Sequence, residues 1–154
     1  MTTPPIEYPS LVHSNLQTFI DAWNEKDLCQ LSSCISDKIV YSNPPIQLGF
    51  FSFPGKKIKG RFNVLKFWKR FFSKFETIEE EKEILSIEKI GKKYVVHCHI
   101  HNFNLGISSK TIFKFNKKSM IDEISFGKVT HLKAEKEISV ISILLKQFKN
   151  KILN

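Results

Sequence analysis

The second half of the chain contains four consecutive strand-like segments, and this pattern limits the possible folds more than any other feature. The segments cover about 80–90, 93–104, 107–118 and 120–128. Tight turns fit between them at Gly91-Lys92, Leu105-Gly106 and Lys117-Lys118-Ser119. Long strands joined by tight turns form an antiparallel meander. We therefore expect a large curved antiparallel sheet with one apolar face, which the rest of the chain must cover.

Amphipathic segments precede these strands. Apolar residues recur at helical spacing over about 10–24, with Ser10 as a suitable N-cap. These residues are Val12, Leu16, Phe19 and Trp23. Asp27 followed by Gln30 resembles a capping box and predicts a short second helix. A helix over about 61–75 is apolar around most of its circumference, which indicates burial on more than one side.

Between the second and third helices, residues 38–42 are predicted to form a strand, which Asn43-Pro44-Pro45 ends. We interpret residues 46–59 as a loop or loose hairpin. The element order predicts a single α+β domain over 10–131, in which helices pack on the sheet and enclose an apolar pocket. Residues 1–9 are expected to form an extended lead, because they contain three prolines.

A basic amphipathic helix is expected within residues 132–154, beyond the last strand. Three placements are open for it. It can close the pocket, pair with another subunit, or lie on anionic lipid. We favour packing on its own domain or on a dimer mate, and we expect a homodimer or another protein partner.

Composition excludes several classes of protein. No apolar run approaches the roughly 18 residues of a membrane span, and no signal peptide is recognisable, so a cytoplasmic location is expected. The formal net charge is +9, but only Arg61 and Arg70 are arginines, which disfavours specific nucleic-acid recognition. The three cysteines lack metal-binding spacing and are expected to be buried free thiols. They are Cys29, Cys34 and Cys98.

Strand periodicity assigns side chains to the two faces of the sheet. In the segment 93–104, Val96, Cys98, Ile100 and Asn102 share one face, and three histidines share the other. The first set is more apolar and should face the helices. The histidines should therefore point away from the pocket.

Three short motifs occur in a consistent order. They are Asn24-Glu25-Lys26-Asp27-Leu28, Ile39-Val40-Tyr41-Ser42-Asn43-Pro44, and Lys59-Gly60-Arg61-Phe62 followed by Phe67-Trp68. Over about 10–128 their order and spacing resemble the NTF2-like superfamily, in its SnoaL-like and ketosteroid isomerase-like branch. The resemblance implies an NTF2-like (cystatin-like) cone, with a curved antiparallel sheet wrapped around a long helix. The C-terminal helix is an addition to that pattern.

The same resemblance implies where catalytic groups should lie. The isomerase branch has a catalytic Asp before the proline of its first strand, and Asn43 occupies that position here. A Tyr and an acidic donor form its oxyanion site, and the matching positions are Phe19 and Thr111. Asn cannot take up a proton at neutral pH, and Phe cannot donate a hydrogen bond. Ketosteroid isomerase chemistry is therefore disfavoured.

The candidate ligand-pocket residues combine apolar and polar side chains. They are Phe19, Trp23, Tyr41, Asn43, Trp68, Cys98, Ile100, Asn102, Thr111 and Phe113. Phe50, Phe51 and Phe53 are lid candidates, with packing on the core or on a partner as the alternative. No carboxylate is clearly inside. Asp21 and Asp37 are the nearest candidates, and Glu79-Glu80-Glu81 is interpreted as a solvated strand entrance.

The pattern His97-x-His99-x-His101 suggests a metal site, since alternate residues on a strand lie about 7 Å apart. A fourth ligand such as His131 or Asp122 would have to complete it. We favour three histidines on a solvent or dimer face, so no metal and no cofactor are expected. A pH-sensitive interface is a further alternative.

Two functions remain open. The first is binding of a small apolar molecule, with isomerase, cyclase or dehydratase chemistry as an extension. The second is a non-catalytic interaction or assembly module. The missing base favours the second, whereas the predicted pocket favours the first.

Overall fold

The computed structural model describes residues 7–43, 46–48, 51–53, 55–104 and 106–131. Its elements follow the predicted order. The helices are α1 (Glu7–Glu25), α2 (Leu28–Cys34) and α3 (Arg61–Phe72). The strands are β1 (Ile35–Asn43), β2 (Ile46–Leu48), β3 (Phe51–Phe53), β4 (Lys56–Lys59), β5 (Glu80–Ile90), β6 (Lys93–Asn102), β7 (Ile107–Phe115) and β8 (Ile121–His131). The predicted helix within 132–154 lies outside the described residues.

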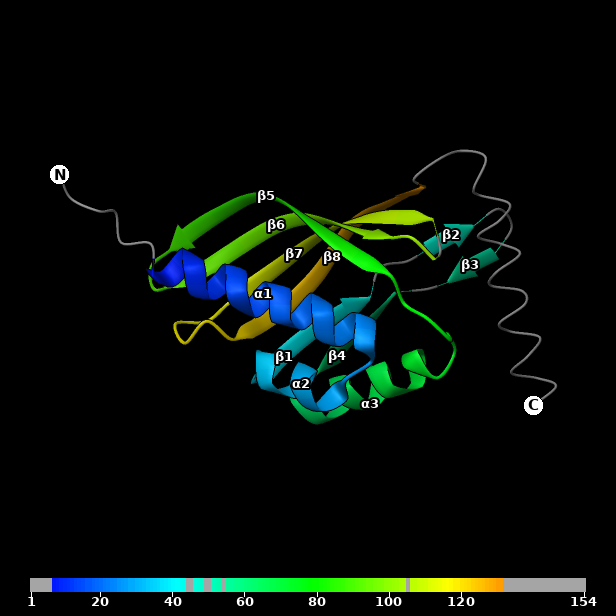
Figure 1. The fold of residues 1–154 in the computed structure, drawn as a ribbon, viewed down its shortest axis with the longest axis horizontal. Helices are drawn as coiled ribbons and strands as arrows, with labels where there is room; N and C mark the ends of the chain where they lie inside the picture. Colours follow the sequence, from blue (N-terminus) through cyan, green and yellow to red (C-terminus); the bar gives the residue numbers. More distant parts are fainter. Residues whose placement is uncertain (1–6, 44–45, 49–50, 54, 105, 132–154) are drawn as a thin grey trace.

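A six-stranded sheet in the order β4-β1-β8-β7-β6-β5 forms the body of the domain. Strands β5 to β8 form the predicted meander, with antiparallel neighbours throughout. The prediction of a wholly antiparallel sheet is wrong at one place, because β1 pairs in parallel with β8. The long connection from β1 to β8, which contains α3 and strands β5 to β7, allows this pairing, since a parallel neighbour needs a long connection. Figure 1 shows α1 lying along the sheet, with α2 and α3 beside β1 and β4.

Two helix starts illustrate how local sequence fixes these elements. Asp27 caps α2 as predicted, and its carboxylate accepts a hydrogen bond from the Gln30 amide at 3.0 Å. The helix α1 begins at Glu7, before the predicted Ser10 cap. Pro9 is compatible with this earlier start because it lies in the first turn, where its missing N–H has no helical partner.

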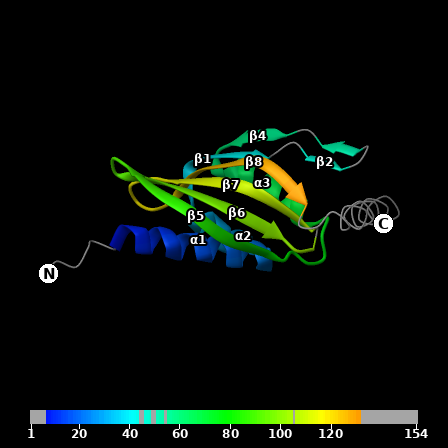
Figure 2. The ribbon, with the colours of Figure 1, turned by 90° about the horizontal axis from the view of Figure 1, so that it is seen from above.

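Residues 46–59, interpreted as a loop or loose hairpin, contain a hairpin and one further strand that was not predicted. Strands β2 and β3 form a separate two-stranded hairpin, and β4 pairs with β1 at the edge of the main sheet. In Figure 2, β2 and β4 both lie along the upper edge of the view, next to β1. Phe51 and Phe53 belong to β3, whereas Phe50 lies outside the described residues. The lid hypothesis for these phenylalanines therefore stays a prediction.

Gly60 connects β4 to α3 in a conformation that favours glycine. Its φ of +91° is one that L side chains rarely adopt, and its amide donates to the Ile39 carbonyl at 2.8 Å. Arg61 then donates to the Ile35 carbonyl at 2.8 Å and pairs with Asp37 at 2.6 Å. These contacts hold the start of α3 against β1, which aims the apolar side of α3 into the domain.

Buried side chains of the three helices and the sheet meet in one core. The largest fully buried residues include Trp68, Phe113, Phe115 and Leu16. Cys34 and Cys98 are buried free thiols as predicted, but Cys29 is exposed and corrects that prediction. Among the described residues, no helix is long and apolar enough to cross a membrane.

Candidate functional site

The predicted sidedness of the central strands is confirmed. Val96, Cys98, Ile100 and Asn102 are buried, whereas the intervening histidines are only half-buried on the opposite face. On β7, Thr111 and Phe113 are buried and face the same interior. Asn43 lies at the end of β1, but its side chain is outside the described structure. The pocket candidates whose side chains are described are therefore all buried in the domain, and their role in a ligand pocket stays a prediction.

Aromatic side chains occupy much of this interior. Trp68 of α3 contacts Trp23 and Phe19 of α1 with ring centroids 5.3 and 5.7 Å apart. Tyr41 of β1 packs edge-on against Trp68 at 5.4 Å, and Phe113 packs against Phe19 at 5.6 Å. These distances are normal for contacting rings. We call Phe19, Trp23, Tyr41, Trp68 and Phe113 the aromatic cluster.

A carboxyl group also lies in this interior, which the sequence analysis did not expect. Glu80 at the start of β5 is half-buried as a residue, but its carboxyl group is enclosed. Its Oε2 accepts a hydrogen bond from the Asn102 side-chain amide at 2.8 Å. The interpretation of this segment as a solvated strand entrance is therefore wrong for Glu80.

The surroundings of Glu80 favour its protonated form. Burial raises the pKa of its carboxyl group to about 7, because charge is less well solvated in the interior than in water. The Asn102 amide and the nearby Trp23 indole oppose this change. At neutral pH, both the protonated and the ionised forms of Glu80 are therefore populated.

Tyr41 extends the polar part of the interior. Burial and the nearby Glu80 charge both raise the pKa of its phenol, so the hydroxyl stays protonated and can donate a hydrogen bond. The Trp68 indole lies beside this hydroxyl and acts in the opposite direction. A neutral donor and a titrating carboxyl are thus close together in a mostly apolar setting.

Two buried indole N–H groups add donor capacity. Neither Trp23 Nε1 nor Trp68 Nε1 has a partner that meets ordinary hydrogen-bond geometry. They lie near Glu80 and Tyr41, respectively, without a well-formed bond to either. A buried donor without a partner costs about 1–3 kcal/mol. Each of these N–H groups can donate a hydrogen bond to an oxygen atom of a bound molecule.

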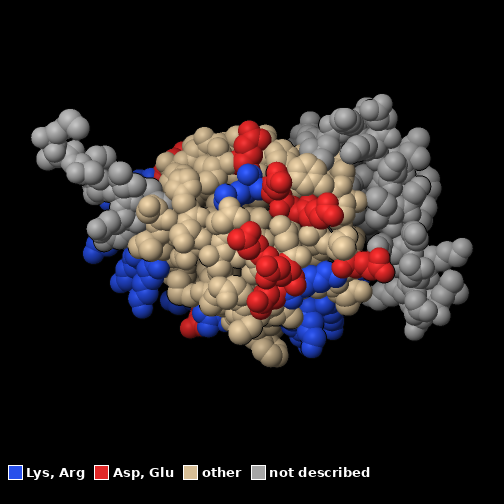
Figure 3. All heavy atoms as spheres, viewed as in Figure 1, with Lys and Arg blue, Asp and Glu red and all other residues tan. Residues whose placement is uncertain are grey.

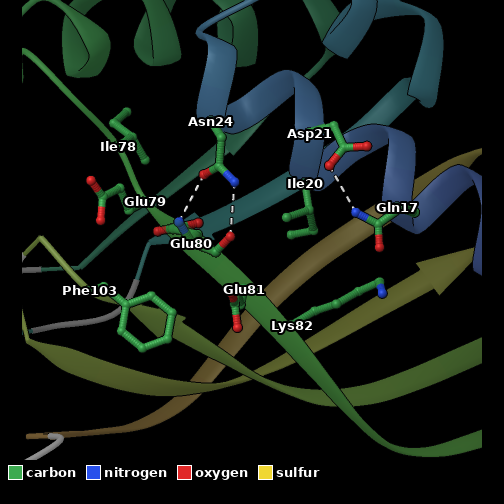
Figure 4. A pocket seen from close by; sticks show the side chains of 10 residues that line it. All are labelled: Gln17, Ile20, Asp21, Asn24, Ile78, Glu79, Glu80, Glu81, Lys82 and Phe103. Carbon is green, nitrogen blue, oxygen red and sulfur yellow. Dashed lines mark hydrogen bonds between the residues drawn. The ribbon is translucent and has the colours of Figure 1, made fainter.

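Asn24 at the end of α1 positions the Glu80 backbone. Its side-chain oxygen accepts from the Glu80 amide at 2.8 Å, and its side-chain nitrogen donates to the Glu80 carbonyl at 2.9 Å. Figure 4 shows this pair of bonds between α1 and β5. The start of β5 is therefore held against α1.

A groove of about 650 Å³ lies between α1 and the start of β5. It is lined by Gln17, Ile20, Asp21, Asn24, Ile78, Glu79, Glu80, Glu81, Lys82 and Phe103. Figure 3 shows acidic side chains gathered on this face of a chain whose net charge is +9. Because Ile20, Asn24 and Glu80 line it, the groove adjoins the interior that contains the Glu80 carboxyl.

The two carboxylates named from the sequence lie elsewhere. Asp21 lines the outer groove and accepts a hydrogen bond from Gln17 at 2.8 Å. Asp37 is 85% exposed and pairs with Arg61. Neither lies inside the aromatic cluster, so Glu80 replaces them as the interior carboxyl.

A β-bulge explains why sequence reasoning missed Glu80. The β5–β6 register changes by one residue between Ile84 and Ser86. Without it, the hairpin register would place Glu81 opposite Asn102; with it, Glu80 is the partner. The sequence did contain one clue. Asn102 was predicted to face inward, and a buried amide needs a polar partner, so a polar side chain had to lie opposite it.

The outward face of the sheet carries the three histidines. His101 Nε2 lies 3.1 Å from a carboxylate oxygen of Glu83, and the His99 and His101 rings are 6.0 Å apart. His97 does not join this group. The sequence spacing suggested a site of His97, His99 and His101. In the structure, the residues that lie close together are Glu83, His99 and His101.

No family model matches this chain, and no curated protein sequence matches it significantly. Solved structures do match. A domain of unknown function with a cystatin-like fold from Nostoc punctiforme PCC 73102 has a TM-score of 0.63 and 15% identity, over 99% of this chain and 97% of that chain. A SnoaL-like protein of unknown function from Burkholderia thailandensis E264 has a TM-score of 0.55 and 16% identity, over 77% and 96%.

An LEH-like epoxide hydrolase from M. tuberculosis has a TM-score of 0.51 and 15% identity, over 94% of this chain and 96% of that chain. At such low identities these likenesses establish the fold and not the activity. The chain has the NTF2-like (cystatin-like) fold, as its sequence predicted.

Proposed function

We propose that this chain binds a small, largely apolar molecule with a carbonyl or hydroxyl group, and that Glu80 exchanges a proton with it. The observation that carries the proposal is the enclosed Glu80 carboxyl, with a pKa of about 7, beside Asn102 and Tyr41. A group that titrates near the working pH can both take up and release a proton. A mostly apolar interior with a few polar groups suits such a ligand.

The proposed chemistry is acid–base catalysis of an isomerase, cyclase or dehydratase type. Ionised Glu80 would remove a proton from a carbon next to the ligand carbonyl, and protonated Glu80 would return it to the product or to a leaving hydroxyl. The Tyr41 hydroxyl and the indole N–H groups of Trp23 and Trp68 would donate to the ligand oxygen as it becomes negative. The groove beside Glu80 is the proposed route of entry.

Fluorescence tests the binding step directly. Trp23 and Trp68 are the two tryptophans of the chain, and both lie in the aromatic cluster. We expect steroid-like or polyketide-like probes to change the emission saturably. E80Q should weaken binding of carbonyl-bearing probes and abolish turnover, whereas E88Q, at an exposed residue of the same strand, should change neither. Unchanged emission with every probe would contradict the proposal.

The second candidate is a non-catalytic assembly module. The observation that favours it is the close packing of the aromatic cluster, since side chains occupy space that a ligand would need. Light scattering after size-exclusion chromatography tests it. A stable homodimer combined with no probe binding would support this function, and a monomer that binds probes would reject it.

A further inference from the structure

The outward face of the sheet brings together three side chains that suit a transition metal. Glu83 lies directly opposite His99 in the pairing of β5 with β6, and His101 follows His99 on the same face. One ligand atom from each residue can be chosen so that all three lie within 4.8 Å of one another. Within the described residues, these three are the one set of histidine, cysteine or acidic side chains whose ligand atoms come this close together.

We propose that Glu83, His99 and His101 form a binding site for one divalent ion of the Zn²⁺ class. Imidazole and carboxylate ligands suit zinc, nickel and copper better than magnesium or calcium. Three protein ligands leave a fourth position for water or for a donor from another molecule. This site is separate from the proposed Glu80 site, because the two lie on opposite faces of the sheet.

The geometry requires only small side-chain movements. In a tetrahedral zinc site with bonds near 2.1 Å, neighbouring ligand atoms lie roughly 3.4 Å apart. The Glu83 and His101 atoms are already 3.1 Å apart, and ligand atoms of all three residues lie within 4.8 Å of one another. The two strands carrying these residues are held by backbone pairing on both sides of the site.

The local environment leaves the ligand atoms accessible. The Glu83 side chain is 60% exposed and that of His101 is 23% exposed, so an ion can reach them from solvent. His101 Nδ1 is buried, and Nε2 is the nitrogen that faces Glu83. In register, Glu81 lies opposite His101 and Lys110 lies opposite His99, so one neighbour of each charge adjoins the site.

Metal titration of the full chain tests the proposal. Zn²⁺ is titrated against a chromogenic chelator, and Co²⁺ is used for its absorption spectrum, in a C29S background that removes the exposed thiol. We expect one equivalent of Zn²⁺ to bind. E83Q, H99Q and H101Q should each lower the affinity by about tenfold or more, because each removes a ligand or its charge. Circular dichroism confirms that the variants are folded.

The matched control is H97Q, which removes a histidine from the same strand and face but outside the group. It should bind Zn²⁺ as the parent does. His13 and His131 remain in every variant, so any contribution from them is constant. Absence of saturable binding, equal binding by all variants, or an equal loss in H97Q would each overturn the proposal. Probe binding measured by tryptophan fluorescence is expected to be unaffected in all of them, which keeps this test independent of the proposed function.

Discussion

At the scale of single residues, Glu80 is an ionisable group whose carboxyl is enclosed by the domain. It places a titrating carboxyl among aromatic rings, with Asn102 as its hydrogen-bond partner. Burying such a group is unfavourable unless its charge is removed or compensated. The raised pKa shows that the fold favours the neutral form. Ionisable groups with pKa values changed by burial are common at sites that bind or react with ligands.

The pH dependence of stability follows from this pKa. Between about 4.5 and 7, folded Glu80 holds its proton more tightly than unfolded Glu80, so the free energy of unfolding falls as pH rises. This rise in the Glu80 pKa corresponds to a decrease of about 3 kcal/mol in the free energy of unfolding between these two pH values. We expect E80Q to remove this loss, so that the variant gains stability relative to the parent at pH 8 but not at pH 4.

Urea denaturation at several pH values measures the effect. E88Q provides the control, since it removes a carboxylate from an exposed position of β5. Its pH profile should match that of the parent. Parallel profiles for E80Q and the parent would show that Glu80 titrates normally and would remove the basis of the proposed proton transfer.

At the scale of elements, the start of β5 is controlled from two sides. The bulge between Ile84 and Ser86 decides which glutamate faces inward, and Asn24 holds the Glu80 backbone against α1. Both devices act on the same short segment. The position of the carboxyl therefore depends on contacts between α1, β5 and β6 and not on β5 alone.

Substitution of Asn24 tests this dependence. N24A removes two hydrogen bonds to the Glu80 backbone and should lower the free energy of unfolding by about 1–3 kcal/mol. Q17A is the control, because Gln17 lies on the same helix and its one side-chain hydrogen bond within the described part of the chain is to Asp21, an exposed neighbour. It should change stability by less than about 0.5 kcal/mol. Chemical denaturation compares the two, and equal effects would argue against a positioning role.

At the scale of the whole molecule, Trp68 joins the parts of the domain. It extends from α3 to rings of α1 and β1, while β1 in turn pairs with β8. The aromatic cluster, the parallel pairing of β1 with β8 and the Asn24–Glu80 hydrogen bonds thereby attach the first half of the chain to the meander. We expect the domain to unfold as a single cooperative unit.

Truncation of this tryptophan should affect the whole domain. W68A leaves a large cavity in the core and is expected to lower the free energy of unfolding by about 3–5 kcal/mol. F62A on the same helix is the control, since Phe62 is 78% exposed and its loss should be nearly neutral. Circular dichroism during urea unfolding measures both. A loss below about 1 kcal/mol for W68A would mean that α3 is not central to the fold.

The sequence by itself determined the type and order of most elements, and the two faces of β6. Helical spacing in α1 and two-residue alternation in β6 are local patterns, which burial of one face imposes on the sequence. The same alternation predicted that Cys98, Ile100 and Thr111 face inward while the histidines face outward. The fold resemblance depended on these patterns in their order.

Only the tertiary structure decided the pairing of β1 with β8, the bulge in β5 and the contacts that follow from them. A bulge shifts the register by one residue, so the side chains of the strand on its two sides face as if one residue had been inserted between them. It brought Glu80 to Asn102 inside the domain and Glu83 to His99 and His101 outside it. Each of these groups joins residues from different strands, and their proximity depends on a register that the spacing within one strand does not contain.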